Sequence, residues 1–225
     1  MKKIVIFGLV VIAILSAVVA FKIDDIMAYY THNDKRINKF SVGSVEATVT
    51  EPNYVNNQVI VPNETITKDP TYSNTGEVDC YIRAQIYTPI SKNIKYVDGN
   101  ENIVTPAEEI DLLTYTVNDG WVEVEDSPSD TLKFNGIYED SKGNKYRVRT
   151  YKYVEGGQEK VVSAGETIST PVFSTVSTIN YLDIESAVNL KMYASAIAVQ
   201  NEGESAEKMW EAFKNQNGTG IIGIQ

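Results

Sequence analysis

Apolar and polar side chains alternate over residues Val78–Tyr87, and this is the most regular pattern in the chain. The apolar positions are Val78, Cys80, Ile82, Ala84 and Ile86. Successive side chains of a β-strand point to opposite sides, so the pattern predicts a strand with one buried face. The preceding Ser73-Asn74-Thr75-Gly76 combines Asn and Gly, which tolerate a left-handed backbone and favour a reversal. We therefore predict a hairpin-like unit over Val59–Tyr87.

Similar alternation predicts strands in four other stretches. They are residues 40–49, 120–124, 146–151 and 188–198. The first stretch changes phase near Gly43-Ser44, which predicts a β-bulge there. In the last stretch one face would carry Leu190, Met192, Ala194, Ala196 and Ala198. Because Tyr, Thr and Val are frequent and Leu is scarce, we predict one all-β domain, a jelly-roll-like β-sandwich with a few short peripheral helices.

Two segments carry helix signals. Thr105-Pro106 followed by Glu108-Glu109 combines an N-cap, a Pro at the first helical position and acids in the first turn, which predicts a short helix ending at Leu113. Ser205 is predicted to cap a second helix that lids one end of the sandwich. Its apolar stripe would consist of Ala206, Met209, Trp210 and Phe213. The residues Asn217–Gly220 after this helix are predicted to be loose.

A short internal repeat links two distant parts of the chain. Glu64-Thr65-Ile66 and Glu166-Thr167-Ile168 each stand a few residues ahead of a proline. Two copies are too few for a solenoid, so we predict related strand–loop units in the two halves of a sandwich.

The first residues resemble an export signal. Lys2 and Lys3 precede an uncharged apolar run, Ile4–Phe21, and Ala28 offers a small residue for cleavage. The run is also close to the minimum length of a membrane span, so an uncleaved anchor remains the alternative.

The net charge and the single cysteine argue against two kinds of function. The formal net charge of −10 argues against binding of nucleic acid or anionic lipid through the body of the protein. The single cysteine, Cys80, falls on the apolar side of its strand, which favours a buried hydrophobic role over a redox role.

Catalytic and metal-binding signals are weak. His32 is the only histidine and there is no HExxH motif, so a histidine-based zinc site would lack ligands. The acidic stretches Glu108-Glu109 and Glu123–Asp126 offer calcium ligands, but a solvated acidic face is the simpler interpretation. We therefore predict no cofactor, no metal and no catalytic residue.

Three side chains on the polar side of strand 78–87 allow two interpretations each. Arg83 either extends to solvent or pairs with an acid such as Asp69 or Asp79. Tyr81 and Tyr87 share its face, which is either an assembly surface or ordinary packing.

Seven positions in and beside this strand resemble a family signature. They are Lys68, Asp69, Pro70, Asn74, Gly76, Tyr81 and Arg83. In order and spacing they are similar to the TasA/camelysin family, secreted proteins of Gram-positive bacteria with a SipW-type signal peptide. The resemblance implies cleavage between Ala28 and Tyr29, although the family's acidic residue after the junction is displaced here to Asp34. It also implies a signal peptide at 1–28, an N-terminal arm at 29–39 and one sandwich domain at 40–225 with an insertion at about 91–162.

The function that the resemblance implies is structural. The protein would be a non-enzymatic subunit of extracellular fibres, in a biofilm matrix or on the cell surface. Its partners would be further copies of itself, a minor or anchor subunit and a SipW-type signal peptidase, with membrane contact only through the signal segment. The alternatives are a camelysin-type cell-surface metalloprotease and a monomeric surface adhesin.

The arm is the predicted assembly element. It is freed only when the signal peptide is cut, and Tyr29, Tyr30 and Ile37 supply apolar groups to a solvated segment. A strand donated by a neighbour would cover an open sheet edge, which is also how TasA-like proteins are understood to polymerise. The alternative is that the arm pairs within its own subunit.

Overall fold

A computed structural model describes residues 31–33, 44–54, 61–184 and 190–224. The chain divides into a unit of residues 1–31 and a unit of residues 32–225, and the second unit carries the sheets. The predicted signal peptide, the arm residues other than 31–33 and the predicted bulge at Gly43 lie outside the described residues. Within the described ranges, no helix has both the length and the apolar character needed to cross a membrane.

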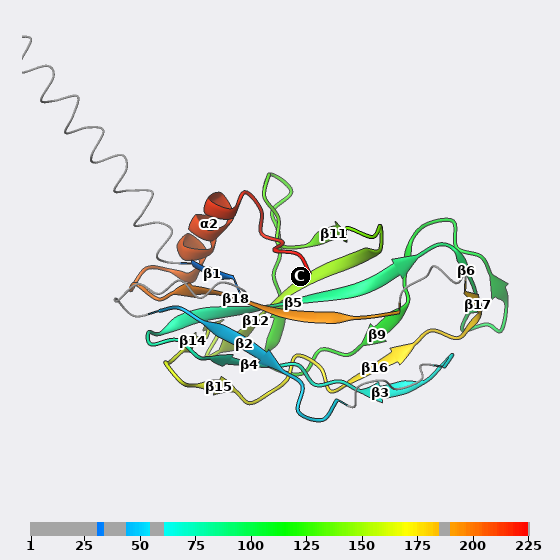
Figure 1. Ribbon diagram of the computed structural model, residues 1–225, viewed down its shortest axis with the longest axis horizontal. Helices are drawn as coiled ribbons and strands as arrows, with labels where there is room; N and C mark the ends of the chain where they lie inside the picture. The colour runs from blue at the N-terminus through cyan, green and yellow to red at the C-terminus, as the bar shows by residue number, and fades with distance from the viewer. Residues whose placement is uncertain (1–30, 34–43, 55–60, 185–189, 225) are drawn as a thin grey trace, which may run out of the picture. The chain divides into compact units, whose positions relative to one another are not determined.

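The main sheet forms one layer of the molecule (Figure 1). Its central path is β1 (Thr31–Asn33), β18 (Tyr193–Gln200), β5 (Cys80–Ser91), β12 (Lys145–Glu155) and β10 (Trp121–Glu123). Four shorter strands flank it: β8 (Ile110–Asp111), β11 (Gly136–Glu139), β13 (Gln158–Glu159) and β14 (Val161–Val162). β12 pairs with β5 from Tyr146 to Lys152, so the stretch 91–162 supplies a central strand of this sheet.

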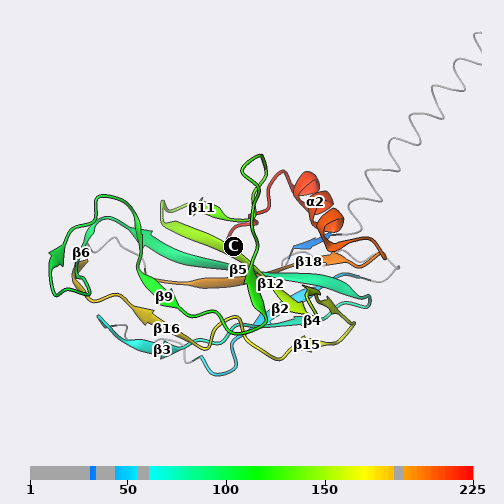
Figure 2. The ribbon, with the colours of Figure 1, turned by 180° about the vertical axis from the view of Figure 1, so that it is seen from behind.

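Two three-stranded sheets form the opposite layer, and Figure 2 shows them from behind. One has the order β15 (Thr167–Ile168), β4 (Thr71–Asn74), β2 (Ala47–Thr50), and the other β3 (Thr65–Thr67), β16 (Thr175–Thr178), β9 (Leu113–Tyr115). A further small sheet contains β17 (Tyr181–Ile184), β6 (Ile94–Val97) and β7 (Ile103–Val104). The predicted all-β sandwich is therefore confirmed.

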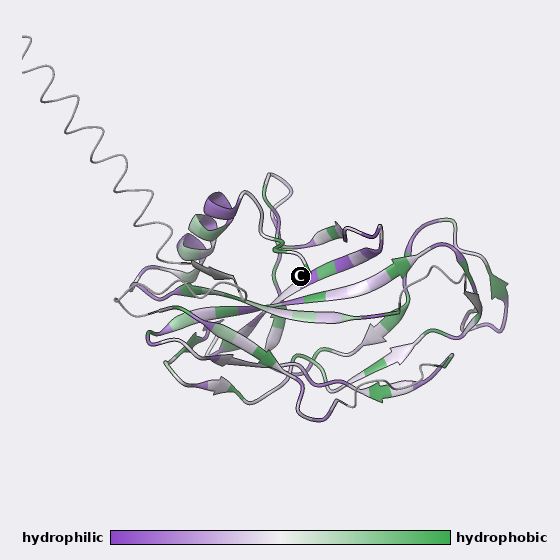
Figure 3. Cartoon of the chain, viewed as in Figure 1, coloured by the Kyte–Doolittle hydropathy of each residue, from purple (hydrophilic) through white to green (hydrophobic). Residues whose placement is uncertain are grey.

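The core lies between the layers, and Figure 3 shows apolar residues interspersed along the strands of both. The predicted apolar face of β5 is buried there, with Cys80, Ala84 and Ile86 fully inaccessible. Met192, Ala196 and Ala198 join this core, as predicted, although β18 begins at Tyr193 rather than at residue 188. The small side chains Ala196 and Ala198 of β18 are packed into this core.

The outer face of β5 is buried as well, which corrects the prediction of one buried face. The helix α2 (Ala206–Asn217) covers its first half, capped by the Ser205 side chain as predicted. Trp210 and Phe213 of α2 pack with Tyr81 of β5. The residues after α2 cover the second half of this face, so the prediction of a loose tail was also wrong: Gly220 is buried and its carbonyl is bonded to Gln85.

The predicted hairpin is absent because β4 and β5 belong to different sheets. The turn at 73–76 passes the chain from one layer to the other. Thr75 and Gly76 donate their backbone N–H groups to the Glu46 carbonyl just before β2. Because of these two bonds to a distant segment, the turn connects the two layers instead of two strands of one hairpin.

The segment 105–113 contains the short strand β8 and the first residue of β9 instead of the predicted helix. Ile110 and Asp111 of β8 pair with the end of β5, and Leu112 and Leu113 are buried. Long-range pairing and burial outweigh the local capping signals, which are worth only about 1 kcal/mol each. Among the described residues α2 is the only helix, whereas a few short helices were predicted.

The predicted internal repeat is confirmed as a shared local structure. Asn63 and Gly165, each just before the Glu, adopt positive φ angles of 57° and 77°. The Glu64 carboxylate accepts the N–H of Val61, and the Glu166 carboxylate accepts the N–H of Ser163, three residues earlier in both cases. The two turns lead into β3 and β15, whose ladder partners are β16 and β4.

Candidate functional site

The sheet edge beside β18 is the candidate assembly site. The described part of the predicted arm, Thr31–Asn33, forms β1, which is the hydrogen-bonded neighbour of β18. β18 is eight residues long and β1 three, so β1 is too short to pair along the whole edge. The predicted cleavage residues Ala28 and Tyr29 and the assembly residues Tyr30 and Ile37 lie outside the described residues.

Lys68 and Asp69 of the family-like motif hold the loop after β2 rather than presenting a site. Lys68 Nζ lies 2.6 Å from the Glu51 carboxylate and 4.5 Å from the centre of the Tyr54 ring. The Asp69 carboxylate accepts both the backbone N–H and the side-chain amide of Asn53. Lys68 and Asp69 are buried, whereas their partners are half-buried or exposed, so the two side chains fix the loop after β2 to the body of the sandwich.

Pro70 contributes to the same crossing through its backbone. The Pro70 carbonyl accepts the N–H of Val172 at 3.1 Å, just beyond the proline of the second repeat. A proline has no N–H to offer a ladder, so it is suited to the break between two strands.

Asn74 and Gly76 form the corner between the two layers. The Asn74 amide is fully buried and donates to the carbonyls of Val78 and Val162, while its oxygen accepts from Gly76 N. A Cβ at Gly76 would collide with the Ser44 carbonyl oxygen and lie 2.7 Å from Glu46 N. Only glycine fits against this backbone, which explains the residue at this position.

Arg83 is buried in an ion pair that sequence reasoning did not identify. Arg83 Nε and Nη2 donate to Glu159 Oε1 and Oε2 at 3.0 and 2.9 Å, and both side chains are at most 5% exposed. The guanidinium lies 4.4 Å from the Trp210 ring and 4.8 Å from the Phe134 ring. Trp210 Nε1 donates to the same carboxylate. The predicted partners Asp69 and Asp79 were therefore wrong, and no spacing in the sequence links Arg83 to Glu159.

Tyr81 and Tyr87 do not form an open assembly surface, because α2 and the residues after it cover them. Burial, followed by the nearby negative charges of Glu159 and Glu207, raises the pKa of Tyr81. Burial likewise raises the pKa of Tyr87 to about 12, against the opposing effect of its hydrogen bonds. Both phenols are neutral at physiological pH and act as packing groups.

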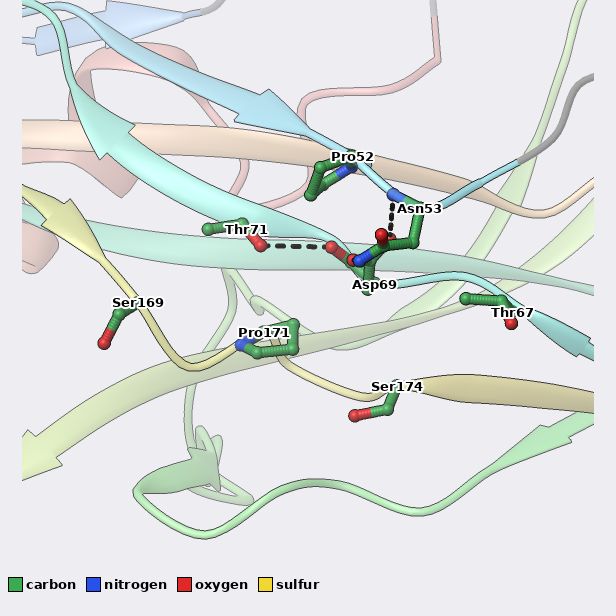
Figure 4. A pocket seen from close by; sticks show the side chains of 8 residues that line it. All are labelled: Pro52, Asn53, Thr67, Asp69, Thr71, Ser169, Pro171 and Ser174. Atoms are coloured by element: carbon green, nitrogen blue, oxygen red, sulfur yellow. Dashed lines mark hydrogen bonds between the residues drawn. The ribbon is translucent and has the colours of Figure 1, made fainter.

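A cavity of about 400 Å³ lies beside the segments that follow β3 and β15 (Figure 4). It is lined by Pro52, Asn53, Thr67, Asp69, Thr71, Ser169, Pro171 and Ser174. Asp69 is the charged residue among these eight, and Figure 4 shows its carboxylate turned toward Asn53. The cavity therefore presents mainly hydroxyl groups and proline rings.

Across the described residues, no group of three or more His, Cys, Asp or Glu side chains is placed to hold a metal ion. The acid Asp111, which lies between the two predicted acidic stretches, is engaged by Arg147 and Arg149 at 2.8 and 2.6 Å. His32 lies in β1.

Cys80 is expected to resist alkylation in the folded protein. It is fully inaccessible, and burial raises its thiol pKa to about 12, so the reactive thiolate is scarce at neutral pH. Iodoacetamide at pH 8 should modify it only after denaturation, as read by mass spectrometry. Rapid modification without denaturant would contradict the buried placement, and the same assay serves as a test of folding for substituted or truncated variants.

No protein-family model, curated protein or solved structure matches the chain.

Proposed function

We propose that the protein is a secreted structural subunit of extracellular fibres, which polymerises when the arm of one copy pairs with the β18 edge of the next. In the structure β1 pairs with β18 of its own chain, as in the alternative arrangement, and this match between the arm and the β18 edge is the observation that carries the proposal. An edge strand with unpaired backbone groups recruits another strand unless it is covered. The arm segment that lies there is the one that signal-peptide cleavage would release.

Exchange of the arm between copies would cost little free energy, because the arm forms the same backbone hydrogen bonds with its own β18 as with the β18 of another copy. An arm that pairs with its own β18 gives a closed monomer. When the arm of one copy pairs with the next copy, the β18 edge of the first copy stays open for the arm of a third copy. Such a head-to-tail contact does not close into a ring of fixed size. The outcome is a filament, whose growth depends on protein concentration and on release of the arm.

The buried family-like motif supports a division of roles. Lys68, Asp69 and Arg83 are partnered within the sandwich and Asn74 and Gly76 form its corner. These residues stabilise the subunit, and assembly is assigned to the sheet edge. The proposal includes the SipW-type signal peptidase and a minor or anchor subunit as further partners, and it assigns no catalytic step to the chain.

Deletion of Tyr29–Asn38 from the secreted form is expected to leave a folded monomer that forms no filaments. The deletion removes β1 but none of the described core residues. Electron microscopy and sedimentation measure assembly, and protection of Cys80 from iodoacetamide verifies folding. Filaments of normal length from the truncated protein would exclude donation by the arm.

Proline substitutions provide a sharper version of the same test. Neighbouring residues of a strand point their N–H groups to opposite edges, so one of His32→Pro and Asn33→Pro removes a bond toward β18. That variant should lose filaments, while His32→Ala and Asn33→Ala, which keep the N–H, should assemble normally. Loss of assembly in both alanine controls would point to side-chain recognition instead of strand pairing. A well-folded subunit that binds surfaces but forms no filaments under any condition would favour the adhesin.

A further inference from the structure

The residues after α2 cover an apolar patch on the outer face of the main sheet. This tyrosine patch consists of Tyr87, Tyr138, Tyr146, Val148 and Tyr193, from β5, β11, β12 and β18. The covering segment, Thr219–Ile224, lies on it through Ile221 and Ile224. In Figure 1 the chain runs from α2 to the C mark over this face.

The covering segment is held through its backbone by side chains of the patch and its surroundings. Gln85 Nε2 donates to the Gly220 carbonyl at 2.7 Å, and Gln85 Oε1 accepts the N–H of Ile222 at 3.2 Å. Tyr87 Oη accepts the N–H of Gly223 at 3.1 Å. Gln85 and Tyr87 are both fully buried. These are the contacts of a bound peptide, and among the described residues the segment forms no strand.

Two glycines of the covering segment lie too close to the patch and its surroundings to be replaced by a larger residue. A Cβ at Gly220 would lie 2.6 Å from the Lys133 carbonyl oxygen and 2.9 Å from the Phe134 ring. Gly223 has a positive φ of 86°, and a Cβ there would lie 3.0 Å from the Tyr138 ring. The surface therefore selects an extended peptide with glycine at these two positions and isoleucine beside them.

The patch is built by the sheet and not by the peptide. Tyr87 packs against Tyr138, and Tyr146 against Tyr193, both with ring centres 5.7 Å apart. The segment joins α2 through Gly218, which has a positive φ of 66° and open space around it. A short connection of this kind is where a segment can be exchanged between copies.

We propose that the tyrosine patch is a peptide-binding site whose second occupant is the covering segment of another copy of this chain. The covering segment makes the same contacts whether it lies on the patch of its own copy or on that of another copy. The protein concentration therefore decides between the two arrangements. The exchange links copies through the face of the sheet, independently of the arm and of the β18 edge.

The test starts from the folded full chain with a protease recognition sequence inserted between Gly218 and Thr219. After cleavage and removal of the released peptide, a labelled peptide of residues 219–225 should bind the emptied protein, as measured by fluorescence anisotropy. The same peptide with Gly220→Val and Gly223→Val should bind at least about tenfold more weakly, a loss of about 1.4 kcal/mol. Absence of binding, or equal binding of the two peptides, would overturn the proposal.

A second measurement uses the intact chain, in case emptying the patch unfolds the protein. Full-length Gly223→Val, in which the covering segment fits poorly, should bind the labelled wild-type peptide more tightly than the unsubstituted chain does. Full-length Gly136→Phe should block the patch, because a Cβ at Gly136 already lies 3.4 Å from Ile221.

Mixing of the two proteins then tests the exchange itself. Emptied protein mixed with Gly136→Phe should form a one-to-one complex, seen by light scattering, that neither forms alone. Failure of this complex despite peptide binding would exclude exchange between copies. Removal of the arm should change neither result, which separates this proposal from the fibre proposal.

Discussion

Replacement of Arg83 by methionine is expected to lower the free energy of unfolding by about 3–5 kcal/mol, because it leaves the Glu159 carboxylate buried without its partner. The side chain also packs between Trp210 and Phe134, so its loss loosens α2 from the sheet. Urea unfolding followed by circular dichroism measures the change. A variant that loses less than about 1 kcal/mol would show that the Glu159 carboxylate finds another partner at little cost.

Two matched variants separate the buried charge from the lost packing. In Arg83→Met combined with Glu159→Gln no charge remains, and the amide oxygen still accepts from Trp210, so part of the loss should be recovered. The exposed pair Lys208–Glu204 provides the surface control. Lys208→Met should change stability by at most about 0.5 kcal/mol, as expected of a solvated ion pair at the surface.

Gly76→Ala is expected to destabilise the fold by about 3 kcal/mol, at the upper end of the cost of overpacking. The added methyl group meets the backbone of Ser44 and Glu46, which cannot rotate away as a side chain would. The strain also displaces the Gly76 N–H from the Glu46 carbonyl at the corner between the layers. Thermal and urea unfolding measure the loss, and faster labelling of Cys80 should accompany it.

Gly99→Ala is the matched control for this corner. Gly99 lies in an exposed turn between β6 and β7 with no atom within 4 Å of an added Cβ. Its substitution should leave the free energy of unfolding nearly unchanged. Equal effects of the two substitutions would mean that flexibility of the glycines, and not the close approach at Gly76, sets the cost.

Only part of the candidate assembly site could be predicted from the sequence. The arm was recognised because a polar segment comes after an apolar run and a small residue, which is a local pattern. Its neighbour β18 was predicted as a strand from its own alternation. That these two segments lie beside each other is a contact between residues about 160 positions apart, and no local pattern encodes such a distance.

Elements whose signals repeat over several turns or pairs of residues were determined by the sequence alone. β5 follows from its alternation, α2 from the Ser205 cap and its apolar stripe, and the repeated Glu-Thr-Ile turns from two copies of the same residues. Each of these signals acts within a few residues, where side-chain spacing and capping bonds are sufficient to select the backbone.

Tertiary structure decided everything that depends on a distant partner. It paired Arg83 with Glu159, put β8 against β5 where a helix was predicted over 105–113, and sent the chain from β4 into another sheet. It also covered the outer face of β5 with α2 and the covering segment. The physical reason is the same in each case: burial and long-range hydrogen bonds contribute more free energy than the local preference of a short segment, so the packed chain selects among the conformations that the sequence permits.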